Sequence, residues 1–128
     1  MEEKKLKLLF IDDEKDYLDI CRKYFTMKNI QVFTALNGLD GLALAKTEKP
    51  DLIVLDVRMP GLDGIKVLKE LRSFDQHVKV IILSGFGTNH NVLEASKLAV
   101  SDFLNKPFVL STLQKVIEEA IANKVPSD

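Results

Sequence analysis

The chain has 128 residues, and its 18 lysine and arginine residues nearly balance 19 aspartates and glutamates, which leaves a net charge of -1. This balance argues against direct binding to nucleic acid or to a membrane surface, and the longest apolar stretches fall well short of the roughly 20 residues that a membrane span needs. The length suits one domain with its own hydrophobic core, and we expect it to span residues 1–128 with no output domain attached.

Short apolar runs alternate along the chain with stretches of helical periodicity. The runs at 7–11, 31–35, 52–56, 79–84 and 102–105 predict β-strands, and the stretches at about 15–28, 38–48, 64–73, 89–98 and 109–122 predict α-helices. Parallel neighbours in a sheet need crossover helices, so five β-α units with short connections indicate a parallel sheet covered on both faces. The predicted fold class is α/β, with a doubly wound five-stranded parallel sheet.

The single cysteine, Cys21, excludes a disulfide within the chain and suits a reducing compartment. In the predicted helix at 15–28 it shares a face with Leu18 and Phe25. We therefore interpret Cys21 as a core residue rather than a nucleophile, and we expect a cytoplasmic protein.

Polar residues stand at the ends of four predicted strands: Asp12 and Asp13 after the first, Asp56 closing the third, Ser84 closing the fourth, and Lys106 after the fifth. The carboxyl ends of parallel strands meet at one edge of a sheet, where open α/β folds bind ligands. Carboxylates gathered there repel one another unless a divalent cation joins them, and Mg²⁺ prefers carboxylate oxygens and water. The set therefore predicts a magnesium site with room for a phosphate.

Each of these residues also has a purely structural interpretation. One aspartate of the pair at 12–13 could cap the helix at 15–28 while the other complements its dipole, Ser84 could cap the helix after its strand, and Lys106 could extend into solvent. Two adjacent acids opposite a third favour metal binding over capping alone. Asp56 ends an aliphatic strand, so its carboxylate needs a cation or an ammonium group as a partner. A carboxylate in that position can also be a nucleophile toward phosphorus.

Taken together, four segments resemble the receiver domain of two-component response regulators: the acidic pair at 12–13, LDVRMPGLDG around Asp56, the Ser84-Gly85 step and DFLNKPF at 102–108. The resemblance covers essentially the whole chain. It implies a flavodoxin-like (βα)5 fold with strand order 2-1-3-4-5, and a phosphorylation-controlled signalling switch that accepts its phosphoryl group from a phosphohistidine donor.

The resemblance also implies which residues bind the metal and accept the phosphoryl group. Asp56 would be the phospho-acceptor. Asp13, Asp56 and the backbone carbonyl of Arg58 would be Mg²⁺ ligands, while Asp12 would act mainly through a metal-bound water. Mn²⁺ is an alternative ion for the same site.

The resemblance also implies roles for residues around the phosphoryl group. Ser84 and Lys106 would contact its oxygens, and Phe103 matches the switch aromatic of the family. Arg58 and Phe86 occupy positions that influence how long the phosphoryl group survives. The chain would not be a conventional enzyme, but it would catalyse its own phosphoryl transfer and a slow, Mg²⁺-dependent autodephosphorylation.

The partners implied by the resemblance are a sensor histidine kinase or a phosphotransfer protein. An output partner or domain would bind through the helix at 89–98, the strand at 102–105 and the helix at 109–122, and a phosphorylation-dependent dimer is a further assembly to expect. Val92 and Val116 fit either the apolar rim of this surface or the core.

Three alternatives compete with this interpretation. GFGTNH at 85–90 partly resembles a dinucleotide-binding turn, but His90 replaces the third glycine. A Mg²⁺-dependent phosphatase with an aspartyl nucleophile needs a second acid two residues after Asp56, where Arg58 stands. The stronger rival is a receiver-like interaction module that is not phosphorylated, although such relatives usually lose part of the acidic cluster or the lysine.

Overall fold

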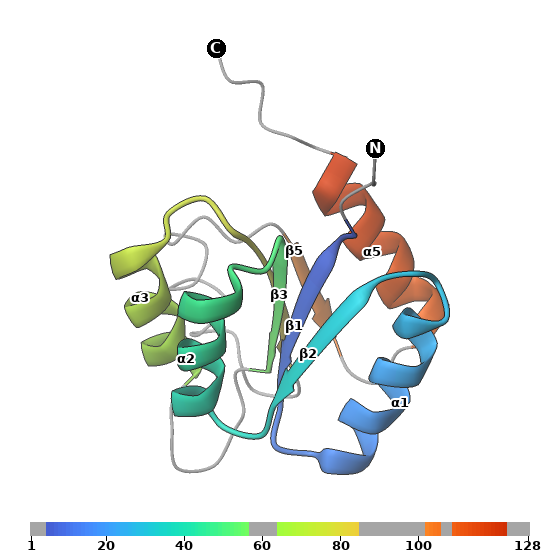
Figure 1. Cartoon of the computed structure of the whole chain (residues 1–128), viewed down its shortest axis with the longest axis horizontal. Coiled ribbons are helices and arrows are strands. Elements are labelled where there is room, and N and C mark those ends of the chain that lie inside the picture. The colour runs from blue at the N-terminus through green and yellow to red at the C-terminus, as the bar shows by residue number, and fades with distance from the viewer. Residues whose placement is uncertain (1–4, 57–63, 85–101, 106–108, 123–128) are drawn as a thin grey trace.

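A computed structural model describes residues 5–56, 64–84, 102–105 and 109–122 of the chain (Figure 1). Five parallel strands form one sheet in the order β2-β1-β3-β4-β5. The strands are β1 (Lys7–Ile11), β2 (Gln31–Ala35), β3 (Leu52–Asp56), β4 (Lys79–Ser84) and β5 (Asp102–Asn105). All five coincide with the predicted strands, and the strand order implied by the resemblance is confirmed.

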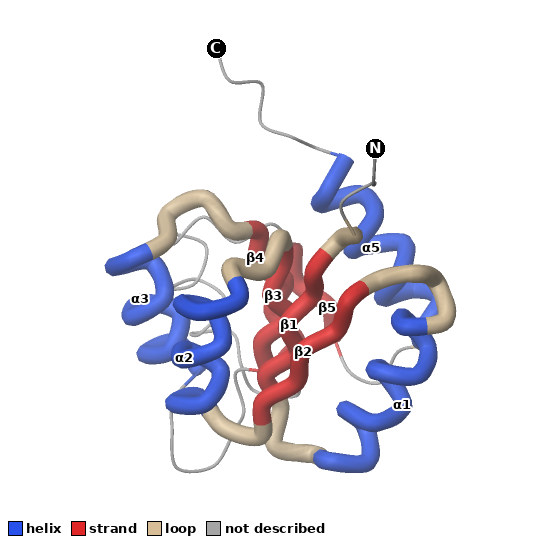
Figure 2. Tube along the Cα trace, viewed as in Figure 1, coloured by secondary structure: helices blue, strands red, loops and turns tan. Residues whose placement is uncertain are grey.

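Helices cover both faces of this sheet, as Figures 1 and 2 show. Helices α1 (Lys15–Thr26) and α5 (Leu110–Ala122) lie on one face, and α2 (Gly38–Glu48) and α3 (Gly64–Phe74) lie on the other. The doubly wound arrangement is therefore confirmed, while the predicted helix at 89–98 lies outside the described residues. None of the helices in the described ranges has the length and hydrophobicity that spanning a bilayer requires.

The sheet separates two hydrophobic cores because successive strand residues point to opposite faces. Leu9, Ile11, Ile53 and Leu55 contribute to the core under α2 and α3, and the alternate strand residues contribute to the core under α1 and α5. The second core contains Leu8, Phe10, Leu52, Val54, Leu18, Cys21, Phe25, Leu113 and Ile117. The prediction that Cys21 shares a buried face with Leu18 and Phe25 is confirmed.

Helix α1 ends two residues earlier than the periodicity predicts. The N–H groups of Lys28 and Ile30 both donate to the carbonyl of Phe25, and Asn29 takes the left-handed conformation with φ 64°. This conformation suits asparagine better than most residues, and it turns the chain from α1 into β2. The structure also extends α3 by one residue, to Phe74, and starts α5 at Leu110 rather than at residue 109.

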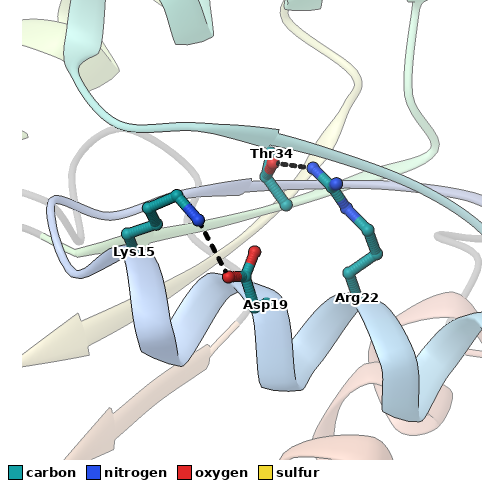
Figure 3. Close-up of polar contacts among 4 residues, drawn as sticks. All are labelled: Lys15, Asp19, Arg22 and Thr34. Carbon is teal, nitrogen blue, oxygen red and sulfur yellow. Dashed lines mark hydrogen bonds and ion pairs between the residues drawn. The ribbon is translucent and has the colours of Figure 1, made fainter.

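A polar contact joins α1 to the edge strand β2, and a second one lies within α1 (Figure 3). The guanidinium of Arg22 donates a hydrogen bond to the hydroxyl of Thr34 on β2. One helical turn away, Lys15 and Asp19 form an ion pair at 3.1 Å, in the i, i+4 spacing that places side chains on one face of a helix. The Arg22–Thr34 contact helps to fix α1, whose first residue closely follows the acidic pair at 12–13.

Candidate functional site

Asp12 and Asp56 lie next to each other at the carboxyl edge of the sheet. Strands β1 and β3 are neighbours, and Ile11 at the end of β1 pairs with Leu55 on β3. Asp12 therefore leaves the sheet beside Asp56, the last residue of β3, at the point where the strand order reverses. Both side chains are buried, with exposed fractions of 1% for Asp12 and 4% for Asp56.

Backbone and side-chain hydrogen bonds hold Asp12 in place. Its N–H donates to the carbonyl of Ala35 at 3.1 Å, which extends the pairing of β1 with β2 by one step. Its Oδ1 atom accepts a hydrogen bond from the N–H of Glu14 at 3.0 Å. Such an aspartate turn fixes the direction in which the carboxylate points.

The helix-capping interpretation of the acidic pair differs from what the structure shows. The residue at the N-cap of α1 is Glu14, which has an extended backbone and makes no capping hydrogen bond with its side chain. Asp12 precedes the cap by two residues and Asp13 by one, so neither aspartate occupies the capping position. The positions of Asp12 and Asp13 are explained better by the carboxylate cluster that they form with Asp56.

Asp12, Asp13 and Asp56 form a compact cluster of carboxylates. One oxygen from each side chain lies within 4.8 Å of the corresponding oxygens of the other two. An octahedral ion with ligands at about 2.1 Å spaces its oxygen atoms about 3 to 4 Å apart, so small side-chain adjustments suffice for joint coordination. Since Asp13 is exposed while the other two are buried, the cluster opens to solvent on one side. The predicted meeting of these three acids is confirmed, and their oxygen atoms fit a hard divalent cation.

The other predicted site residues are described only in part. The backbone of Ser84 ends β4 opposite Asn105 on β5, while Asp56 pairs with Leu83, so Ser84 stands one residue beyond the level of Asp56 at the same edge. The backbone of Phe103 pairs with Ile82 within the sheet. Arg58, Phe86 and Lys106 lie outside the described residues, as does Val92. The roles assigned to these side chains remain predictions.

The sequence interpretation missed Tyr17, whose phenol lies on α1 near the acidic cluster. Its hydroxyl oxygen is buried. Burial raises the pKa of Tyr17 far above its usual value, and the Cys21 side chain and the charges of Asp12 and Asp56 act in the same direction. Tyr17 and Cys21 are four residues apart, a spacing that places both on one side of α1 and could have indicated this contact.

Val116, which fits either the core or the rim of an output surface, is partly buried. It packs against the core between the sheet and helices α1 and α5. It therefore contributes to the core without being fully enclosed in it.

Comparisons with known proteins agree with this arrangement. A model of the response regulator receiver domain matches residues 8–118. Sporulation initiation phosphotransferase F of Bacillus subtilis is 30% identical over 118 residues, which cover 92% of this chain and 95% of that protein. Transcriptional regulatory protein PrrA of Mycobacterium tuberculosis is 36% identical over 107 residues, which cover 84% of this chain but only 46% of PrrA.

A solved structure matches the fold as well. The receiver domain of the Francisella response regulator 1452 is 35% identical and superimposes with a TM-score of 0.80. The match covers 94% of this chain and all of that one. The chain thus spans whole single receiver domains, whereas it spans 25–46% of the length of longer regulatory relatives.

Proposed function

This chain belongs to the family of response regulator receiver domains, and we propose that it is a phosphorylation-controlled switch with Asp56 as its phospho-acceptor. Its homologues are the phosphorylatable response regulators of two-component systems. The observation that carries the assignment is the position of Asp56, a buried acid that ends β3 within a cluster of three carboxylates. In the absence of a cation, the three carboxylates of this cluster repel one another. A purely structural role for Asp56 would not require two further acids to lie so close to it.

We assign the metal site to Asp12, Asp13, Asp56 and the backbone carbonyl of Arg58, with Mg²⁺ as the ion and Mn²⁺ as an alternative. Asp13 and Asp56 are proposed as direct ligands, and Asp12 as a residue that holds a coordinating water. When bound, the ion supplies the positive charge that lets an anionic phosphoryl group approach an anionic carboxylate.

In the proposed phosphoryl transfer, the side chains of Asp56, Lys106 and Ser84 act together with the bound ion. A carboxylate oxygen of Asp56 attacks the phosphorus of a phosphohistidine, the phosphorus–nitrogen bond breaks, and the released imidazole nitrogen takes up a proton. The Lys106 ammonium offsets the charge on the phosphoryl oxygens, and the Ser84 hydroxyl donates a hydrogen bond to them. Phe103 turns inward into the space that Ser84 leaves, and the output surface changes with it.

The partners follow from the same proposal. Receiver domains interact with histidine kinases or phosphotransfer proteins and with output domains, and we infer that this one takes its phosphoryl group from such a donor in the cytoplasm. The output partner binds along 89–98, β5 and α5. A phosphorylation-dependent dimer through that surface would be a further consequence.

We further propose that Arg58 and Phe86 lengthen the life of the phosphorylated state. Hydrolysis of the aspartyl phosphate needs a water molecule in line with its phosphorus–oxygen bond. A phenyl ring excludes water, and a guanidinium cannot act as a base because it stays protonated. Phosphate release should be faster from Arg58→Asn, Phe86→Ala and the double variant than from wild type. Equal or slower release from all three would contradict the proposal.

The acceptor assignment is tested with a small-molecule phosphodonor and Mg²⁺. Intact-mass measurement should show one added phosphoryl group, which hydroxylamine removes because an aspartyl phosphate is a reactive acid anhydride. Asp56→Asn should abolish the addition, whereas Asp16→Asn, which removes an exposed acid outside the cluster, should not. Wild-type labelling of Asp56→Asn would disprove the assignment, and a chain that is never labelled would favour an interaction module that works without phosphorylation.

A further inference from the structure

Residues of α2 and α3 line a surface groove. The two helices lie on the face of the sheet opposite α1 and α5 (Figure 2). The volume of the groove is about 450 Å³, and it contains none of the acidic cluster residues. One wall is a stripe along α2 that consists of Leu39, Leu42, Ala43 and Lys46. These residues follow the i, i+3, i+4, i+7 spacing of a single helix face, so the wall is continuous over two turns.

The other wall belongs to α3 and consists of Lys66 and Glu70, and Val67 of the same helix lies at the floor between the walls. Phe74, one further turn along α3, is partly exposed, and the ammonium of Lys46 lies 5.0 Å from the centre of its ring. This cation–π contact joins the two walls at one end of the groove and holds the Lys46 side chain in place.

The most exposed apolar side chain of the groove is Leu39, on the α2 wall. Leu39 is 73% exposed, although the stripe that it begins continues into the half-buried Leu42. Isolated exposed leucines are common, but this one borders a concave surface with an apolar floor. Val67 at this floor is itself buried, so Leu39 and Leu42 provide the apolar surface that a partner can reach.

The charges around the groove do not cancel. Lys46 projects from one wall and Lys66 from the other, against a single acid, Glu70. Within the described ranges neither lysine is paired with a carboxylate. The groove therefore presents positive charge on both sides of an apolar floor, although the whole chain has a net charge of -1.

We propose that this groove is a docking site for an amphipathic α-helix of a partner protein, with acidic residues flanking the apolar stripe of that helix. Two helices lying side by side form a trough into which a third helix packs, with its apolar side chains in the groove and its polar face in solvent. Acidic side chains on the two flanks of that helix then reach Lys46 and Lys66. The site is separate from the phospho-acceptor, so it does not depend on the function proposed above.

The test uses the full chain and a synthetic helical peptide of about 18 residues, with leucines at i, i+3, i+4 and i+7 and glutamates on both flanks. A matched peptide carries lysines in place of the glutamates. Backbone amide chemical shifts should change along α2 and α3 when the glutamate peptide is added, and this peptide should bind about tenfold more tightly than the lysine peptide. The preference should shrink as salt screens the lysines.

Three variants make the test specific to the groove. Leu39→Ser and Lys46→Glu should each weaken binding of the glutamate peptide, whereas Glu70→Gln should strengthen it because the one opposing charge is removed. Ile20→Ser is the control, since Ile20 is 53% exposed on α1 and lies outside the groove. Equal binding of both peptides, shifts confined to other elements, or no effect of these variants would overturn the proposal.

Two other occupants would also overturn it. If sedimentation shows a concentration-dependent dimer that Leu39→Ser abolishes, the groove belongs to a second copy of this chain. If decanoate produces the same shifts at a lower concentration than the peptide, the groove belongs to a small amphiphilic acid.

Discussion

The Oδ1 atom of Asp12 accepts a hydrogen bond from the N–H of Glu14 at 3.0 Å, so Asp12 shapes the turn before α1 and belongs to the acidic cluster at the same time. Asp13 is exposed and precedes the N-cap of α1. Replacing Asp13 should therefore leave the turn intact. A variant at this position can test the contribution of the carboxylate charge to metal binding without disturbing the local structure.

Asp13→Asn should lower the affinity for Mg²⁺ by about tenfold or more, since a neutral amide oxygen is a weaker ligand for a hard cation than a carboxylate. The free energy of unfolding without Mg²⁺ should stay the same or rise slightly, because one repulsive charge is removed. Isothermal titration with MgCl₂ measures the affinity, and Asp16→Asn, in the first turn of α1, is the control. Unchanged affinity in Asp13→Asn would remove Asp13 from the metal site.

Tyr17 should make the fold sensitive to alkaline pH. Its folded-state pKa is raised, mainly by burial, above the value near 10 expected for the unfolded chain. The folded state therefore favours the neutral phenol, and the stability contributed by that preference is fully present below about pH 9 and is lost as pH rises past 10. A single proton limits the loss to about 1.4 kcal/mol per pH unit.

Urea unfolding between pH 8 and 11 measures this effect. The free energy of unfolding of Tyr17→Phe should fall less steeply with pH than that of the wild type, because phenylalanine has no proton to lose. Parallel pH profiles for the two proteins would show that Tyr17 ionises freely in the folded state.

Much of this arrangement could be predicted from the sequence, because aliphatic strands such as 52–56 are buried on both faces and leave little freedom in their assignment. The meeting of Asp12 with Asp56 follows once β1 and β3 are neighbours, and the strand order came from the family resemblance rather than from periodicity. The difference in burial between Asp12 and Asp13 could not be predicted, because it depends on the turn geometry after β1. The approach of Tyr17 to the cluster depends in turn on how α1 packs on the sheet.

Lys49 offers a route to a more stable chain. It follows α2 in the left-handed conformation, with φ 50°, where a Cβ atom costs roughly 1 kcal/mol that glycine does not incur. Lys49→Gly should therefore raise the free energy of unfolding by about 0.5–1 kcal/mol, as measured by urea denaturation. Lys23→Gly, which places the same substitution inside α1, should lower it by about 1 kcal/mol. A loss of stability in both variants would show that the backbone at 49 is not strained.

Gly41 should resist substitution because α2 approaches β1 closely there. A Cβ atom at position 41 would lie 2.5 Å from Cδ1 and 2.7 Å from Cγ1 of Ile11, a side chain that is 2% exposed within the core. Gly41→Ala gains about 1 kcal/mol of helix propensity, but overpacking of a core costs about 1–3 kcal/mol, so we expect a net loss of about 1 kcal/mol.

A double-mutant cycle with Ile11→Val identifies the cause of that loss. Valine lacks the Cδ1 atom, so the alanine at 41 should cost less in the Ile11→Val background than in the wild type, with a coupling of about 0.5 kcal/mol or more. Thr47→Ala on the exposed side of α2 is the control, and it should be neutral or slightly stabilising because alanine is the better helix former. If Gly41→Ala is as stable as the wild type, α2 can move away from the sheet. If instead it loses stability equally in both backgrounds, a contact other than Ile11 Cδ1 causes the loss.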